Sequence, residues 1–197
     1  MKYLIFLFSP FLLQAQDTLS YWEEMQQHRD HLNQEFATPE KSPLTEEDLA
    51  VFDSLDFYPV DTQYRIVARF IRTPGEKPFE MATSTSRKPV YEKYGEAHFK
   101  LKGKSLVLNI YQNHRLRKMK DYKDYLFLPF KDFTNGHGSY GGGRFLDLQI
   151  PSGNTIVIDF NKAYNPLCAY NERYSCPIPP EENHLQTAIE AGVKADH

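Results

Sequence analysis

The chain has few of the residues that mark several well-known classes of protein. Its 197 residues include two cysteines and one tryptophan. Two cysteines cannot supply a four-thiolate zinc site. After the first dozen residues, no stretch approaches the roughly 20 apolar residues that a membrane-spanning helix needs. The sequence therefore excludes a cysteine-rich metal domain and predicts no membrane span.

The chain also has no excess of positive charge. Lys and Arg total 23 against 26 Asp and Glu, which gives a formal net charge of -3. A nucleic-acid-binding domain would show a basic face. The basic cluster from Arg115 to Lys123 is interrupted by Asp121 and is typical of a solvated loop. We therefore expect no nucleic-acid partner.

The N-terminus has the pattern of a signal peptide. Met1-Lys2 precedes an apolar run from Tyr3 to Leu13, and Ala15 offers a small residue for cleavage. Pro10 disfavours a buried helix in this run. We predict a signal peptide over residues 1–16, export to the periplasm or out of the cell, and a single β-rich domain over 17–197.

Helical patterns follow directly after this segment. The spacing predicts a helix from Asp17 to Thr38, with Ser20 and Glu23 three residues apart as a capping box. His28 and His31 are expected on its solvated face. A second, short helix should begin with Thr45 as its N-cap and end near Phe52.

After Pro59 the pattern changes to that of short strands. Residues 144–150 and 155–160 flank the turn Pro151–Asn154, which predicts a hairpin. The segment 161–183 is rich in Pro, Asn and Tyr and should be irregular. The fold class is therefore mainly β, a single antiparallel sandwich or partial barrel with one or two N-terminal helices. The expected strands are 64–71, 79–81, 95–101, 106–111, 125–130, 144–150, 155–160 and a final one over Leu185–Ala191.

A glycine-rich segment, Gly136–Gly141, matches the spacing G-x-G-x-x-G. The dinucleotide fingerprint needs a following helix, whose N-terminus meets the pyrophosphate. Here the glycines lead into the strand that begins at Arg144. We therefore exclude dinucleotide binding, predict no cofactor, and interpret the segment as a turn that passes close to another loop or to a ligand.

Cys168 and Cys176 are the two cysteines. In an exported protein a disulfide is the expected state, and closing this short loop would stabilise the fold by about 2.5 kcal/mol. The alternative is a free nucleophilic thiol, which would need a nearby base. A zinc site would require His137 or His184 to join the cysteines, so no metal is predicted.

Polar residues gather where the strand 155–160 ends. Asp159, Asn161, Tyr164 and Asn165 could converge on a ligand, or could stabilise the loop through their own backbone. Arg144 suits bidentate binding of a carboxylate or phosphate, or could be the buried partner of Asp159. The sequence leaves these alternatives open.

The second half of the chain resembles a known family. The segments Tyr140–Asp147, Asp159–Pro166, Cys168–Tyr170, Ser175–Pro180 and Ala191–Gly192, together with Asn183, are similar to the bacterial family called domain of unknown function 1684. The resemblance covers about residues 64–193. It implies a site without naming a reaction, at Arg144, Asp159, Asn161, Tyr164, Asn165, Cys168, Cys176 and Asn183.

Three functions fit these observations. The leading hypothesis is an exported binding domain with a polar cleft for a small polar or anionic ligand, its walls being the glycine turn, Arg144 and the segment from Asp159 to Asn183. The alternative is a hydrolase-like enzyme with Asp159 as general base, Arg144 holding an anion, and a proton carrier among His98, His137 and His184. The third is a structural or interaction domain capped by the disulfide.

Overall fold

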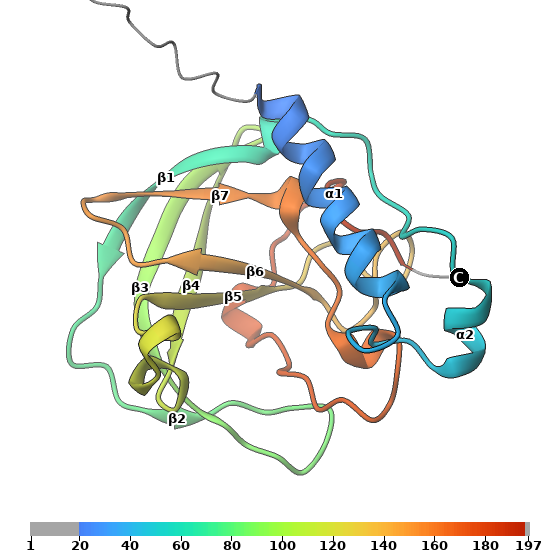
Figure 1. Ribbon diagram of the computed structural model, residues 1–197. Helices are drawn as coiled ribbons and strands as arrows, with labels where there is room; N and C mark the ends of the chain where they lie inside the picture. Colours follow the sequence, from blue (N-terminus) through green and yellow to red (C-terminus); the bar gives the residue numbers. More distant parts are fainter. Residues whose placement is uncertain (1–19, 196–197) are drawn as a thin grey trace, which may run out of the picture.

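The computed structural model describes residues 20–195, so the predicted signal peptide lies outside the described residues. The main element is one antiparallel sheet that curls into a half-barrel (Figure 1). This confirms the predicted fold class, in its partial-barrel form. The strand order is β6-β5-β4-β3-β1-β7, with β2 paired to β3 outside this path. The strands are β1 (Arg65–Arg72), β2 (Phe79–Glu80), β3 (Val90–Leu101), β4 (Lys104–Asn113), β5 (Tyr125–Phe130), β6 (Arg144–Gln149) and β7 (Thr155–Asp159).

Two α-helices precede the sheet. Helix α1 spans Tyr21–Ala37, and the predicted capping box is present, with Ser20 and Glu23 bonded reciprocally. Helix α2 spans Glu46–Val51, and the Thr45 side chain accepts a hydrogen bond from the Asp48 backbone N–H. Figure 1 shows α1 lying against the end of β7. Short 3-10 turns occupy Thr62–Tyr64, Leu116–Lys118, Lys120–Tyr122, Phe160–Lys162, Leu167–Ala169 and Glu181–Asn183.

Strand β3 is longer than predicted, because its first half carries charged residues that hide the alternation. Its register with β4 shifts between Lys93 and Gly95. A Cβ at Gly95 would lie 2.6 Å from the ring of Phe70. Glycine therefore lets β1 and β3 approach closely at this bulge.

The hairpin predicted from β6 and β7 is wrong. The two strands follow each other in sequence, but β6 pairs with β5, and β7 pairs with β1 from Arg65↔Asp159 to Arg69↔Thr155. Both strands are therefore edges of the sheet, and the half-barrel stays open between them. The turn residues were identified correctly; the pairing was decided by which neighbour buries the apolar face.

The predicted final strand over Leu185–Ala191 is also wrong. This segment is irregular and bonds to the loop after β5 instead: the Leu185 N–H donates to the Lys131 carbonyl at 2.8 Å, and the Phe133 N–H to the Thr187 carbonyl at 3.0 Å. The segment therefore covers one end of the half-barrel without joining the sheet.

Alternate residues of the strands divide the apolar side chains between two faces. Leu126, Leu128 and Leu146 belong to the core inside the half-barrel. Phe127 and Phe145 point the other way and form a second cluster on the outer face. Within residues 20–195 no helix is long and apolar enough to span a membrane.

Candidate functional site

Arg144 lies in the interior and not on the wall of a cleft. Its guanidinium is wholly buried and donates to Asp132 Oδ2 at 2.8 Å and to the Ile189 carbonyl at 2.7 Å. It also donates to the carbonyl of Ala191. This corrects its predicted contact with a ligand and its alternative pairing with Asp159, because its partner is Asp132.

Asp159 and Asn161 fasten helix α1 to the sheet. The Tyr21 hydroxyl donates to both Asp159 carboxylate oxygens at 3.0 Å and accepts from Asn161 Nδ2 at 2.9 Å. Arg65 lies 3.7 Å from Asp159. No contact joins Asp159 to Arg144 among the described residues, so the structure does not bring together the predicted catalytic pair.

Asn183 also has a role in the scaffold. It is wholly buried, accepts from the Asn109 backbone N–H at 2.8 Å and donates to the Pro129 carbonyl at 2.7 Å. It therefore joins β4 to β5 through one side chain, a use of amide groups that satisfies buried backbone atoms.

The glycine-rich segment folds onto its own loop. The Gly136 N–H donates to the Ser139 carbonyl at 2.9 Å, and a Cβ at Gly138 would lie 2.3 Å from the Tyr58 hydroxyl. The close neighbour that glycine permits is thus another loop. The segment does not line the cleft described next.

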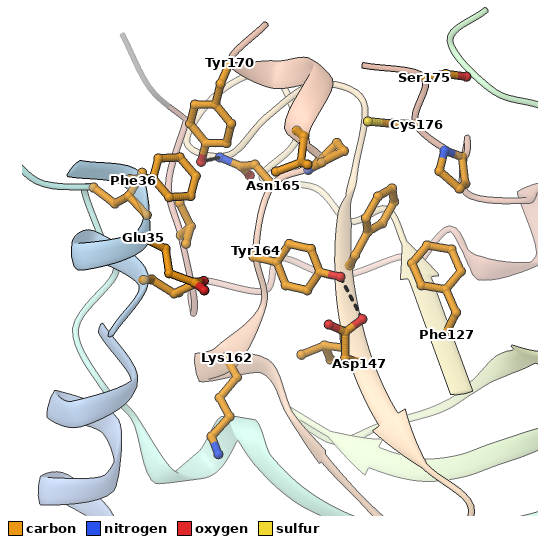
Figure 2. Close-up of a pocket in the computed structure, with 18 of the residues that line it drawn as sticks. Glu35, Phe36, Phe127, Asp147, Lys162, Tyr164, Asn165, Tyr170, Ser175 and Cys176 are labelled. Carbon is orange, nitrogen blue, oxygen red and sulfur yellow. Dashed lines mark hydrogen bonds between the residues drawn. The ribbon is translucent and has the colours of Figure 1, made fainter. Parts of the chain in front are cut away.

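Tyr164 and Asn165 line a cleft of about 530 Å³ on the outer face of β5 and β6 (Figure 2). Helix α1 supplies one wall with Leu32 and Phe36, and the segment around Cys176 supplies another. His28 lines it as well, half-buried, which corrects its expected place on a solvated face. The floor is aromatic, from Tyr91, Tyr125, Phe127, Phe145 and Tyr164.

Asp147 is a charged residue of the cleft that sequence reasoning missed, as it also missed Glu35, Arg87 and Lys162. The hydroxyls of Tyr125 and Tyr164 both donate to Asp147 Oδ1 at 2.7 Å. Figure 2 shows the Tyr164 hydroxyl pointing at Asp147, with this hydrogen bond dashed. The available signal was a single acidic residue inside the apolar strand Phe145–Leu148, on the opposite face from the leucines.

Burial and the Asp147 carboxylate raise the pKa of Tyr125 far above its ordinary value, with burial the larger cause. The same two causes raise the pKa of Tyr164. Both phenols therefore remain protonated donors over the physiological range. They hold the Asp147 carboxylate in one orientation.

Two buried polar atoms of the cleft have no protein partner in the described part of the chain. They are Asn165 Oδ1 and His28 Nε2. Asn165 is 2% exposed, and its Nδ2 donates to the Tyr170 hydroxyl and the Lys194 carbonyl. A buried acceptor without a donor is costly, so Asn165 leaves an unmet hydrogen-bonding group behind the wall of the cleft.

The two cysteines lie side by side as free thiols. The Cys168 backbone N–H donates to Cys176 Sγ at 3.1 Å. Burial raises the pKa of the Cys176 thiol to about 12, which does not suit a nucleophile. The disulfide stays a prediction.

The remaining groups suggested from sequence lie elsewhere. His98 contacts Glu96, and His184 contacts the Pro179 carbonyl; neither these nor His137 lines the cleft. Among residues 20–195, no three His, Cys, Asp or Glu side chains are grouped to hold a metal ion.

Comparisons with known proteins give a family and a structural relative. The family described as "Protein of unknown function (DUF1684)" matches residues 50–194. The chain is similar to the solution NMR structure of an uncharacterized protein from gene locus rrnAC0354 of Haloarcula marismortui, with 35% identity and a TM-score of 0.68. The match covers 88% of this chain and 94% of that one. No curated protein matches the sequence.

Proposed function

The chain belongs to the DUF1684 family of proteins of unknown function, and from this premise we propose that it is a binding domain for a small polar ligand, held in the aromatic cleft on the outer face of β5 and β6. The observation that carries the proposal is Asn165 Oδ1. It belongs to a residue that lines the cleft, and it is a buried acceptor without a donor from the described residues.

The size and lining of the cleft support this proposal. About 530 Å³ lies within the usual range for small-molecule sites, which are mostly apolar with a few oriented polar groups. Here Asp147 and Asn165 are two of the polar groups, and they lie on either side of Tyr164 (Figure 2). Both present oxygen acceptors. The burial of Arg144 removes the main argument for an anionic ligand.

Export is a further part of the proposal. It rests on the lysine, apolar run and Ala15 at the N-terminus. N-terminal sequencing of protein from a bacterial host that secretes it tests this part. The expected mature protein begins near Asp17, and a chain that keeps Met1 after export would contradict the signal peptide.

A pair of exposed apolar residues provides the test of ligand binding. Leu167 is 40% exposed and lines the cleft, whereas Ile178 is 45% exposed and does not. Leu167→Trp should obstruct the cleft, and Ile178→Trp adds the same bulk elsewhere. Thermal unfolding is measured with a panel of sugars, nucleosides, amino acids, organic acids and amines.

At a hundredfold excess over its Kd, a ligand stabilises the folded state by about 2.7 kcal/mol, which raises Tm by several degrees. We expect such a rise for wild type and Ile178→Trp, and a smaller one for Leu167→Trp. An equal response of all three proteins, or no response to any compound, would reject the cleft as the binding site.

A further inference from the structure

We propose, on the basis of the binding function above, that the ligand carries an ammonium group, which binds Asp147 Oδ2 over the aromatic floor of the cleft. The carboxylate, its tyrosine donors and the charges around it carry this inference.

The two carboxylate oxygens of Asp147 differ in the number of hydrogen bonds that they accept. Both tyrosine hydroxyls donate to Oδ1 at 2.7 Å. Each carboxylate oxygen has about two acceptor positions, so Oδ1 is filled. Oδ2 accepts no bond from any residue in the described part of the chain. The carboxylate is thus fixed from one side and presents its second oxygen to a ligand.

The negative charge of Asp147 also lacks a cationic partner among residues 20–195. Lys162 lines the same cleft, but its Nζ lies 2.6 Å from Glu24. Arg87 donates to the Ser175 carbonyl at 2.5 Å and to Ser175 Oγ at 3.1 Å. Figure 2 shows Ser175 and Lys162 at opposite ends of the view, with Asp147 between them. Asp147 is exposed, so solvent screens this charge, and a ligand cation would replace that solvent as its counter-charge.

Aromatic rings form a continuous row in the floor of the cleft, and Phe127 lies opposite Asp147 in the pairing of β5 with β6. The Tyr164 and Phe145 centroids are 6.0 Å apart, those of Phe145 and Phe127 4.8 Å, and those of Phe127 and Tyr91 5.8 Å. The faces of such rings carry partial negative charge and attract cations within about 6 Å. The same surface would repel an anion and suits an apolar or aromatic body on the ligand.

The single available oxygen favours an ammonium over a guanidinium group. A guanidinium binds best as a fork that uses both carboxylate oxygens. The two tyrosine donors already fill Oδ1, so a fork would have to displace one of them. An ammonium needs one oxygen and directs its other N–H groups elsewhere.

Isothermal titration calorimetry with defined probes tests the inference. The cationic probes are phenethylamine, tryptamine and cadaverine; phenethyl alcohol and hydrocinnamate are the neutral and anionic matches of the first. Asp147→Asn keeps an acceptor for the tyrosines and removes the charge. Asp124→Asn removes a carboxylate just before β5 that does not line the cleft.

We expect at least one amine to bind wild type and Asp124→Asn alike, and to bind Asp147→Asn about tenfold or more weakly, because a charge-assisted hydrogen bond is lost. Its neutral match should bind wild type and Asp147→Asn equally. Leu167→Trp should weaken the binding of the amine as well.

Three results would overturn the inference. The first is equal binding of the amine and the alcohol. The second is preferential binding of hydrocinnamate that is weakened in Arg87→Gln. In both cases the cleft would still be a binding site, but not for cations. If no compound of any charge binds in a Leu167-dependent way, the proposed function fails together with the inference.

Discussion

Arg144 and Asp132 form an ion pair in which both side chains are wholly inaccessible to solvent, with Nη2 and Oδ2 2.8 Å apart. The Asp132 carboxylate also accepts from the Thr134 and Ile189 backbone N–H groups at 2.9 and 3.0 Å. The pair therefore joins the start of β6, the loop after β5 and the C-terminal segment. Arg144 belongs to the scaffold that supports the site.

Removing one member of this pair should be strongly destabilising. Arg144→Met leaves the Asp132 carboxylate buried without its cation, which costs about 3–5 kcal/mol. Urea denaturation measures the change in the free energy of unfolding. Arg69→Met is the matched control, because Arg69 is exposed on β1 and should change stability by no more than about 0.5 kcal/mol. Equal stability of the two variants would contradict the role given to Arg144.

Alkaline pH should destabilise the fold through the buried tyrosines. Burial and Asp147 raise the pKa of Tyr125 above 10.0, and burial raises the pKa of Tyr111 to about 12. A group whose pKa is raised by folding contributes stability that is complete below its unfolded pKa. That contribution is lost as pH rises above about 10, by about 1.4 kcal/mol per pH unit and group.

Tyr125→Phe should therefore reduce the slope of stability against pH above 10, as measured by urea denaturation at a series of pH values. Tyr122→Phe, at an exposed neighbouring residue, serves as the control. An unchanged slope in Tyr125→Phe would show that this tyrosine ionises equally in both states.

Gly95 should not tolerate a side chain. Gly95→Ala would place a Cβ 2.6 Å from the Phe70 ring and 2.7 Å from the Ile71 carbonyl oxygen. Such overpacking costs about 1–3 kcal/mol. At Gly153, in the turn before β7, a Cβ would meet nothing within 4 Å. Gly153→Ala should therefore be close to neutral in thermal unfolding, and a similar Tm for both variants would refute the close approach of β1 and β3.

The state of the two cysteines can be counted directly. We expect protein secreted into an oxidising compartment to show no free thiol when it is unfolded without reductant, since Cys168 and Cys176 are neighbours. Reduction should then lower the free energy of unfolding by about 2.5 kcal/mol. The Cys168→Ser/Cys176→Ser double variant controls for other effects of the reductant. Two free thiols in the secreted protein would reject the disulfide.

Local patterns in the sequence determined most of the elements. Ser20 and Glu23 predicted the start of α1, because a capping box depends only on residues three apart. The apolar runs predicted β5, β6 and β7, and the glycine-rich segment was correctly separated from dinucleotide folds by its lack of a following helix. The fold class followed from the number and shortness of these strands.

The pairing of strands was decided only in three dimensions. The turn between β6 and β7 predicts that these two strands pair as a hairpin. Instead β7 pairs with β1, at the edge of the sheet opposite β6. Which strands pair depends on the burial of apolar faces between segments that are distant in the sequence. The residues of a turn carry no information about those distant segments.

The candidate site was likewise predicted in part from the sequence and decided in part by the tertiary structure. The sequence by itself determined that polar side chains gather after β7, and it brought Tyr164 and Asn165 into consideration. Only the tertiary structure decided that Arg144, Asp159, Asn161 and Asn183 hold the scaffold, and that Asp147 faces the cleft with Tyr164. A polar residue's role depends on whether folding leaves its atoms unpartnered, and those partners lie far away in the chain.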